Sequence, residues 1–491
     1  MAEQTAINCQ PEEVFHYFEE ISKIPRGSGN EKAISDYLVS FAKALDLDVA
    51  QDEALNVVIK KPGTAGYEDS PALAVQGHMD MVCEKEAGSP HDFLKDPVRP
   101  RVEGDMMYAT GTTLGADNGI AVAMGMAVLA SDDMPHPPIE LLVTTNEETG
   151  MDGAWALDPG LVSARTLINI DSEEEGILTV SCAGGCTARI NIPVSREAPD
   201  PDLAVLAITI GGLKGGHSGV EIHTGRANAN KVLARFLRGL EPHMKITLFS
   251  IDGGSKHNAI AREACAVIGI KKQDEAALRE NAESLEKVLR DEYKVSDPDI
   301  CLRVGEPGPG QGQAPGGAMT KASAEAVLRF LFLIPNGVQS MSMDIKGLVE
   351  SSLNLGIVRT TEESVEIVST LRSSVASIME NIFNTVETIA GISNGVVTKE
   401  GEYPEWRYNP NSRVRDILVG LHEKLFGEAP KIDAIHAGLE CAVFDKRFGG
   451  AMDMISFGPN IMGAHTTQEH LDIPSTQRMW SYLKEALKAL R

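Results

Sequence analysis

Three short apolar runs constrain the fold of this chain most, because each has the length of one buried strand and each leads to side chains that can bind a metal. These runs and the residues that follow them are 72–76 with His78 and Asp80, 139–145 with Glu147 and Glu148, and 166–170 with Asp171. Two more candidates lie in glycine-bounded loops, Asp117 in Gly-Ala-Asp-Asn-Gly and His465 in Gly-Ala-His-Thr. The sequence therefore predicts strands whose ends gather carboxylates and imidazoles.

Helical spacing appears between and before these runs. Residues 118–130 are typical of a helix between two of the strands, and 11–24 and 30–47 have apolar residues at helical intervals. A further apolar run at 55–60 predicts another strand. Strands that alternate with helices indicate an α/β sheet.

The pattern changes after about residue 186. Residues 188–194 and 203–210 alternate with period two, which predicts strands of a second, α+β region. Its other expected elements are helices at 225–240, 275–293, 321–333 and 374–390, strands near 245 and 266 and at 353–360 and 364–370, and a loop at 305–317.

Beyond residue 400 the chain returns to the first pattern, with helices expected at 411–426 and 475–490 and a strand at 452–457. If His465 is to meet His78, Asp117 and Asp171 around a metal, the chain must leave the first region and come back to it. The expected fold class is therefore α/β, with a discontinuous catalytic domain built on a central mixed sheet flanked by helices. This domain is expected at 1–186 and 400–491, with an inserted α+β lid domain at 187–399.

Size and charge exclude several classes of function. The chain has 491 residues, enough for roughly two or three domains. Its formal charge of −25 disfavours nucleic acid and anionic membrane surfaces as partners, and it has no apolar run of about 20 residues, which a membrane span needs. The first ten residues do not resemble a secretory signal, so a cytoplasmic protein is expected.

Seven scattered cysteines argue against a disulfide framework, and Cys182 and Cys186 are expected to be buried, inert thiols.

The residue types favour a site for two metal ions. Imidazole and carboxylate without thiolate suit Zn²⁺, Mn²⁺ or Co²⁺. Such a site needs a carboxylate that bridges ions about 3.5–4 Å apart, and Asp117, on a glycine-flanked turn, suits that position. Of the adjacent glutamates, Glu148 is expected as a ligand and Glu147 as the general base on a metal-activated water. Asp80 is expected to accept the second ring N–H of His78 and so fix its tautomer.

Each of these residues also has an ordinary structural explanation. An aspartate that precedes a helix, such as Asp117, is most often an N-cap. Glu147 and Glu148 can form a solvated junction between a strand and a loop, and Asp171 can be a polar strand end. A lone loop histidine such as His465 usually has no function. Only the combination favours a metal site.

Five short strings, in this order, resemble the M20 metallopeptidases, and within them the aminoacyl-histidine (Xaa-His, or cytosolic non-specific) dipeptidases. They are Gly-His-Met-Asp at 77–80, Gly-Ala-Asp-Asn-Gly at 115–119, Asn-Glu-Glu-Thr-Gly at 146–150, Asn-Ile-Asp at 169–171 and Gly-Ala-His at 463–465. The resemblance runs essentially end to end. It implies one ion held by His78 and Asp171, a second held by Glu148 and His465, and Asp117 as the bridge. It also implies Glu147 as the base, Asp80 as the residue that orients His78, and a homodimer contact in the inserted region.

The same resemblance implies substrate-binding residues. His217 matches the lid histidine that, in relatives, reaches the partner subunit's active site to polarise the scissile carbonyl. From the sequence alone it is a histidine in a flexible turn. Arg372 resembles the family's arginine for the substrate α-carboxylate, with Asn258 as a second candidate. Glu440 is a candidate partner for the substrate amino terminus, together with His436, although a buried helix N-terminus is the alternative for both.

Together these features predict a metal-dependent dipeptidase, with β-alanyl-histidine and other Xaa-His dipeptides among its substrates. Two divalent ions are expected, with Zn²⁺ favoured over Mn²⁺ and Co²⁺. A metal-bridging hydroxide would attack the peptide carbonyl, with Glu147 as general base. The alternatives are an amino-acid deacylase or tripeptidase on the same scaffold, and an inactive metal-binding scaffold protein. Arg372 favours dipeptides, and the presence of Glu147 argues against an inactive protein.

Overall fold

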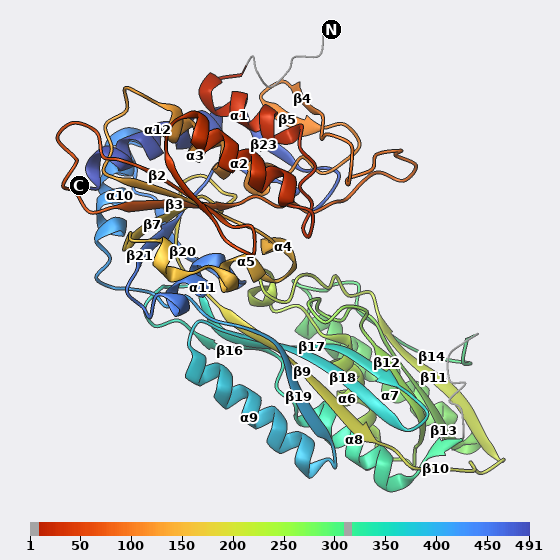
Figure 1. Ribbon diagram of the computed structural model, residues 1–491. Coiled ribbons are helices and arrows are strands. Elements are labelled where there is room, and N and C mark those ends of the chain that lie inside the picture. Colours follow the sequence, from red (N-terminus) through yellow and green to blue (C-terminus); the bar gives the residue numbers. More distant parts are fainter. Residues whose placement is uncertain (1–8, 309–316) are drawn as a thin grey trace. The chain divides into compact units, whose positions relative to one another are not determined.

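The computed structural model describes residues 9–308 and 317–491 and divides the chain into two compact units (Figure 1). The first comprises Met1–Cys182, Trp406–Ala434 and Leu439–Arg491, and the second Ala183–Glu405 and Ile435–Gly438. The first unit is therefore built from both ends of the chain. Two sequence predictions lie partly outside the described residues, namely the signal-free terminus at 1–10 and the loop at 305–317.

An eight-stranded sheet forms the centre of the first unit, in the order β1-β2-β6-β3-β7-β21-β8-β20. β3 runs parallel to β6 and β7, and β21 runs parallel to β7, whereas β1 and β2, β2 and β6, and β21 and β8 pair antiparallel. The strands are β1 (Asp48–Gln51), β2 (Val57–Lys61), β3 (Leu73–His78), β6 (Ile139–Thr144), β7 (Thr166–Asn169), β8 (Ile177–Cys182), β20 (Lys431–Ile435) and β21 (Asp453–Ser456). The mixed sheet confirms the predicted fold class.

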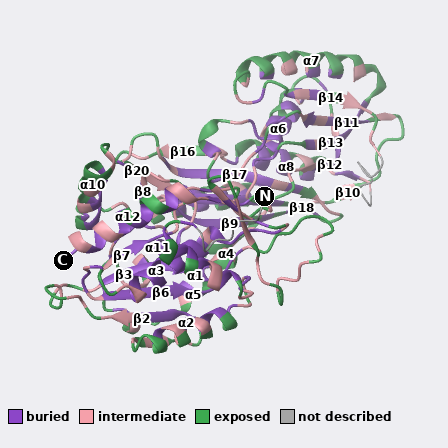
Figure 2. Cartoon of the chain, turned by 90° about the horizontal axis from the view of Figure 1, so that it is seen from above, coloured by how far each residue is buried: buried purple, intermediate pink, exposed green. Residues whose placement is uncertain are grey.

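The parallel strands β3 and β6 are buried along their whole length, as continuous apolar runs predict (Figure 2). The helices of the first unit are α1 (Glu12–Ser22), α2 (Lys32–Ala44), α3 (Ala116–Ala130), α4 (Glu147–Gly150), α5 (Asp152–Ala156), α10 (Arg413–Phe426), α11 (Glu440–Arg447) and α12 (Ile473–Ala489). α3 lies very close to β3, because a Cβ on Gly77 would come within 2.5 Å of the Ala121 side chain. This close approach brings the end of β3 to the start of α3.

A small antiparallel sheet joins early and late parts of the chain within the first unit. It consists of β4 (Pro100–Glu103), β5 (Met106–Ala109), β22 (Ile461–Met462) and β23 (His470–Asp472), in the order β22-β23-β5-β4. Since β23 pairs with β5, the turn between β22 and β23 is held near the segment that leads into α3. That turn carries His465.

The second unit is an α+β structure around a nine-stranded sheet whose pairs all run antiparallel. Its strands are β9 (Gly184–Pro193), β11 (Leu203–Gly211), β12 (Thr247–Gly253), β13 (Ala264–Lys271), β14 (Cys301–Gly305), β16 (Gly337–Met341), β17 (Val349–Thr360), β18 (Ser364–Ser373) and β19 (Val396–Tyr403). The short strands β10 (Arg196–Glu197) and β15 (Ala318–Met319) pair separately.

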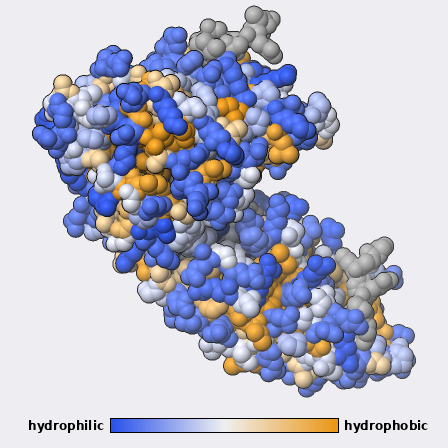
Figure 3. All heavy atoms as spheres, viewed as in Figure 1, coloured by the Kyte–Doolittle hydropathy of each residue, from blue (hydrophilic) through white to orange (hydrophobic). Residues whose placement is uncertain are grey.

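Four helices, α6 (Ala229–Leu240), α7 (Glu275–Glu292), α8 (Lys321–Leu333) and α9 (Ala376–Ile392), complete the second unit. Ile208, Leu237, Phe330, Ile367 and Val386, from strands and helices alike, belong to one buried apolar cluster. Hydrophilic side chains cover much of the face of each unit that Figure 3 shows. In the described part of the chain, no helix has the length and apolarity that a membrane span requires.

Most predicted elements are present, with shifts at their ends. The helix expected at 30–47 ends at Ala44, and a strand, β1, begins at Asp48. The short helices α4, α5 and α11 were not predicted.

Cys182 and Cys186 are buried, as expected from the sequence. Burial raises the pKa of Cys186 to about 11, which disfavours its reactive thiolate.

Candidate metal centre

The metal-ligand candidates lie at the ends of neighbouring elements of the first unit. His78 is the last residue of β3, Asp117 lies at the start of α3, Asp171 follows β7, and His465 lies in the turn between β22 and β23. The two glutamates do not close a strand, as the sequence suggested, since β6 ends at Thr144 and Glu147 and Glu148 begin the helix α4. Their side chains therefore diverge because of a helical turn.

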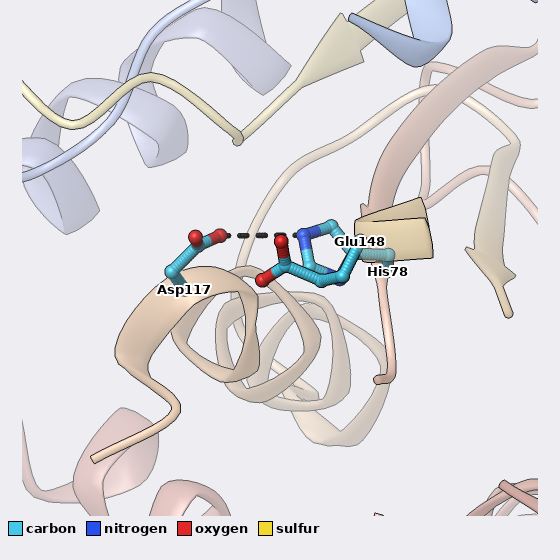
Figure 4. A group of neighbouring side chains, drawn as sticks. All are labelled: His78, Asp117 and Glu148. Atoms are coloured by element: carbon cyan, nitrogen blue, oxygen red, sulfur yellow. Dashed lines mark ion pairs between the residues drawn. The ribbon is translucent and has the colours of Figure 1, made fainter. Parts of the chain in front are cut away.

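His78 faces two carboxylates. Its Nε2 atom lies 3.3 Å from Asp117 Oδ1 and 3.4 Å from Asp171 Oδ1. Figure 4 shows His78, Asp117 and Glu148 pointing toward a common point. One ligand atom from each of these three residues lies within 4.8 Å of the others.

His465 also faces two carboxylates, one of which is that of Asp117, through its other oxygen. Its Nε2 atom lies 3.1 Å from Asp117 Oδ2 and 2.9 Å from Glu148 Oε2. Asp117 thus presents one oxygen to each imidazole, and each imidazole has a further carboxylate of its own. The His465 side chain is 53% exposed, whereas that of His78 is 1% exposed, so this end of the cluster is open to solvent.

The cluster fits metal ions better than it fits hydrogen bonds alone. Two atoms that each lie about 2.0–2.2 Å from one tetrahedral ion are roughly 3.3–3.6 Å apart, close to the spacing around His78. Buried Glu148 Oε1 has no hydrogen-bond partner among the described residues. Three carboxylates and two imidazoles without thiolate form a donor set for Zn²⁺, Mn²⁺ or Co²⁺.

The ionisation of these groups also favours the binding of a cation. Burial raises the pKa of Asp171 to about 6, and the charges of Asp117 and Glu148 add to this rise against the pull of His78. Hydrogen bonds to Asp117 and Glu148 raise the pKa of His465 to about 11. Each imidazole therefore lies where a cation is strongly favoured, which a divalent ion would satisfy.

Asp80 connects the base candidate with a ligand candidate. Its Oδ1 atom lies 3.3 Å from His78 Nδ1 and accepts the backbone N–H of Glu147 at 3.1 Å, while its Oδ2 atom accepts the N–H of Glu148 and the hydroxyl of Ser28. β3 ends at His78, so Asp80 reaches back from the turn beyond the strand. With Nδ1–H facing Asp80, Nε2 of His78 presents its lone pair to the centre.

Glu147 lies beside the cluster. Burial raises its pKa well above the usual range, and the nearby charges of Asp171, Glu440 and Glu148 raise it further, against the effect of His78. A carboxylate whose proton affinity is raised in this way is suited to take a proton near neutral pH.

Asn118 also supports the site, a role that its place in the Gly-Ala-Asp-Asn-Gly motif did not reveal. Buried Asn118 accepts the N–H of His78 through Oδ1 at 3.2 Å and donates from Nδ2 to the carbonyl of Ile170 at 2.6 Å. One side chain thus connects the three segments that carry Asp117, His78 and Asp171. Its role could not be predicted from the sequence, because an asparagine at a helix start is common in any protein.

Within the second unit, hydrogen bonds determine the tautomer of His217. Its Nδ1 atom accepts the backbone N–H groups of Gly219 at 3.2 Å and Val220 at 3.1 Å. Burial and the charge of Arg372 lower its pKa, so the neutral ring is favoured, with its proton on Nε2. Glu221 accepts the N–H of His217 and pairs with Arg226, which holds this loop.

His217, Arg372 and His436 converge on one glycine of the second unit. A Cβ on Gly219 would lie 3.0 Å from His217 Cε1, 3.1 Å from Arg372 Nε and 2.6 Å from the carbonyl oxygen of His436. Arg372 donates to the hydroxyl of Tyr403, and its buried Nε has no partner among the residues described. Burial and Arg372 lower the pKa of His436 to about 3, and its Nε2 lies 2.7 Å from the Ser352 hydroxyl.

The two remaining candidates, Asn258 and Glu440, belong to different units. Asn258 and His217 both line a cavity of about 690 Å³ in the second unit. Glu440 belongs to the first unit and is 0% exposed; its Oε2 accepts from Gln76 and Thr144. Burial raises the pKa of Glu440 to about 7. Its contact with a substrate stays a prediction, because the carboxylate has no exposed surface.

The model of peptidase family M20/M25/M40 matches residues 74–489 of the chain, which include every ligand candidate. The chain belongs to this peptidase family. The resemblance found in the short motifs is thus confirmed.

Two relatives that match over their full length are named as dipeptidases. The chain is 38% identical over 490 residues to the cytosol non-specific dipeptidase of Escherichia coli K12, and the match covers 100% of this chain and 99% of the relative. The aminoacylhistidine dipeptidase of Vibrio alginolyticus has a crystal structure that matches with a TM-score of 0.92 at 36% identity, covering 99% of this chain and 98% of that one. A tripeptidase from Staphylococcus aureus matches with a TM-score of 0.55 at 19% identity, covering 98% of this chain and 99% of that one, which shows the fold alone.

Proposed function

We propose that this protein is a metal-dependent dipeptidase that hydrolyses dipeptides, Xaa-His dipeptides such as β-alanyl-histidine among them. The proposal rests mainly on the position of Asp117. Its two carboxylate oxygens face two different imidazoles, and each imidazole also faces a second carboxylate. The full-length match to the dipeptidases of E. coli and V. alginolyticus supports the choice of substrate class.

The centre is proposed to bind two ions. His78 and Asp171 would hold one, Glu148 and His465 would hold the other, and Asp117 would serve both. Zn²⁺ is favoured, with Mn²⁺ and Co²⁺ as alternatives. When bound, such ions polarise the peptide carbonyl and lower the pKa of water.

Three side chains are proposed to have different roles in the reaction. Glu147 takes the proton of the attacking water and passes it to the leaving amine, which its raised proton affinity supports. Asp80 is the positioning residue for both Glu147 and His78, since it holds the N–H of the first and the ring of the second. His217, with its proton on Nε2, is proposed to donate to the oxygen that becomes negative in the transition state.

Recognition of the two ends of a dipeptide is assigned to separate residues. Arg372 is proposed to bind the substrate carboxylate, and its unpartnered Nε supports this role. Asn258, which lines the same cavity as His217, is a second candidate. Glu440 and His436, both buried, are proposed for the amino terminus.

The first unit is proposed as the catalytic domain. The second is proposed as the inserted lid, through which two chains form a homodimer. A cytoplasmic location is proposed from the name of the E. coli relative. The net charge of −25 disfavours nucleic acid as a partner.

A side-by-side assay tests the substrate class. We expect Ala-His and β-alanyl-histidine to be hydrolysed, and an N-acetylated amino acid and a tripeptide to be hydrolysed at least about tenfold more slowly. Faster hydrolysis of the acetylated amino acid would indicate a deacylase, and faster hydrolysis of the tripeptide would indicate a tripeptidase. Absence of all activity in the metal-loaded protein would favour an inactive scaffold.

A further inference from the structure

Glu469 lies next to the candidate metal centre, and neither the motifs nor the proposed mechanism uses it. Its side chain is 2% exposed, and its carboxylate accepts four consecutive backbone N–H groups. Oε2 accepts from Leu114 at 2.8 Å and Gly115 at 3.0 Å, and Oε1 accepts from Ala116 at 2.8 Å and Asp117 at 3.3 Å. Each oxygen of Glu469 thus accepts two hydrogen bonds from the turn at residues 114–117.

That turn leads into α3 and needs an acceptor, because N–H groups at a helix start have no partner inside the helix. Gly115 has a φ of +68°, which helps the consecutive N–H groups to converge on one anion. A negative charge at a helix start is also electrostatically favourable. With the turn satisfied by Glu469, the carboxylate of Asp117 is not required as an N-cap and faces His78 and His465 instead.

Glu469 also belongs to the turn that carries His465. The backbone N–H of Glu469 donates to the carbonyl of Thr466, and the N–H of Thr466 donates to the carbonyl of Gly463. The residue therefore links the Asp117 turn and the His465 turn, which meet where His465 Nε2 lies 3.1 Å from Asp117 Oδ2.

Buried Arg26 holds the same turn from its carbonyl side. Its guanidinium donates to the carbonyl of Gly115 at 2.5 Å, and to the carbonyls of Met79 at 3.1 Å and Asp80 at 3.3 Å. The Asp117 turn is thus attached to the His78 segment through Arg26 and to the His465 turn through Glu469. Movement of this turn would change the distance of Asp117 from both imidazoles.

We propose that Glu469 is a positioning residue of the metal centre, which sets the direction of the Asp117 carboxylate and thereby the affinity for the ion between Glu148 and His465. This inference rests on the proposed two-ion site. Partners that hold metal ligands in place change metal affinity by about 10- to 100-fold when they are replaced. The effect on the second ion is expected to lie in this range.

Glu469→Gln tests the proposal, because glutamine keeps the size but places an NH₂ donor against N–H donors. The measurement is Zn²⁺ binding to the full chain by equilibrium dialysis and calorimetry. We expect wild-type protein to bind two ions, and the variant to bind one of them at least about tenfold more weakly. Binding of both ions within twofold of wild-type affinity would overturn the proposal.

Glu140→Gln is the matched control. Glu140 is also 2% exposed and also accepts backbone N–H groups, those of Ser163 and Ala164, but it holds no ligand turn. We expect this variant to bind both ions normally. An equal loss of affinity in both variants would show a general effect of a buried glutamine and would also overturn the proposal.

Glu469→Asp keeps the charge but is one methylene shorter, so it cannot reach all four N–H groups. We expect it to weaken the second ion too, and it decides the question if Glu469→Gln does not fold. Normal binding of both ions by Glu469→Asp would overturn the proposal, because the four N–H contacts would then not set the affinity. Failure of wild-type protein to bind two ions would instead contradict the proposed function on which this inference depends.

Discussion

At the scale of single residues, the geometry of Asp117 determines what the centre can do. Its two oxygens face different imidazoles at 3.3 and 3.1 Å, so one carboxylate can serve two ions. Glu147 and Glu148 are adjacent on α4, yet Glu148 contacts His465 directly, whereas Glu147 lies beside the cluster and senses the charges of its members. The two glutamates can therefore have different tasks.

Glu147→Gln separates these tasks, because the amide cannot take a proton but has nearly the same size. We expect turnover of a dipeptide to fall about 10²- to 10⁴-fold, the range of general base catalysis. Metal content should stay at the wild-type level, since Glu148 is unchanged. Both are measured on the same preparation, by steady-state kinetics and elemental analysis. Near-normal turnover would refute the assignment of Glu147 as the base.

His436 should make stability depend on pH. Burial and Arg372 lower its pKa to about 3 in the folded protein, below its usual value of about 6.5. Between these values the unfolded chain binds more protons, so stability is lost as pH falls from 6.5 toward 3. Between pH 7 and pH 5 this loss is about 2 kcal/mol.

His436→Gln should remove that loss. Urea unfolding at pH 7 and pH 5, with a chelator present throughout, measures the change in unfolding free energy. We expect the change to be smaller in His436→Gln than in wild type, whereas His243→Gln, at an exposed position, should behave as wild type. Equal pH dependence of wild type and His436→Gln would contradict the explanation.

Sequence reasoning could identify ligand candidates but not their supports. His78, Asp117, Glu148 and His465 are chemically distinctive and follow recognisable patterns, and the structure brings them together. Glu469 lies 352 positions from Asp117, and a buried glutamate has no local signature. Whether Asp117 was an N-cap or a ligand depended on that distant partner, so the local sequence could not decide it.

At the scale of elements, α8 shows how a helix end is completed by a neighbouring helix. Lys231 of α6 donates from Nζ to the carbonyls of Leu331, Phe332 and Ile334, where α8 ends. These carbonyls have no partner within the helix, and a cation is favoured at this end. Burial lowers the pKa of Lys231 to about 8.

Lys231→Met should destabilise the second unit, because it leaves these carbonyls without their donor. We expect the unfolding free energy to fall by about 1–3 kcal/mol. Lys287→Met, at an exposed position of α7, is the control and should change stability by less than about 0.5 kcal/mol. Circular dichroism during urea unfolding measures both. A fall no larger than that of the control would show that solvent replaces the lost donor.

Elements with many residues and a clear period could be predicted, and short ones could not. The apolar runs of β3, β6 and β7 and the periodic α12 were expected close to their observed bounds. α4 has four residues and α11 eight, too few for a period to be recognised. The missed α4 explains why Glu147 and Glu148 were placed at a strand end.

At the scale of the whole molecule, the first unit is closed by segments from both ends of the chain, and β23 pairs with β5 beside the candidate centre. Metal binding should therefore stabilise the contact between early and late segments, since an ion that binds only the folded state shifts the folding equilibrium. The second unit has a core and sheet of its own.

Removal of metal should loosen the first unit selectively. Hydrogen exchange with and without a chelator should show faster exchange of the backbone N–H groups at 114–117 and 463–469, by about tenfold or more. Exchange in β17 and β18 of the second unit should not change. Equal acceleration in both units would mean that the ions stabilise the protein without a local site.

Anomalous X-ray scattering from crystals grown with Zn²⁺ tests the central claim most directly. The account predicts two peaks about 3.5–4 Å apart, one beside His78 and Asp171 and the other beside Glu148 and His465, with the carboxylate of Asp117 bound to both. A single peak, or two peaks that Asp117 does not join, would contradict it.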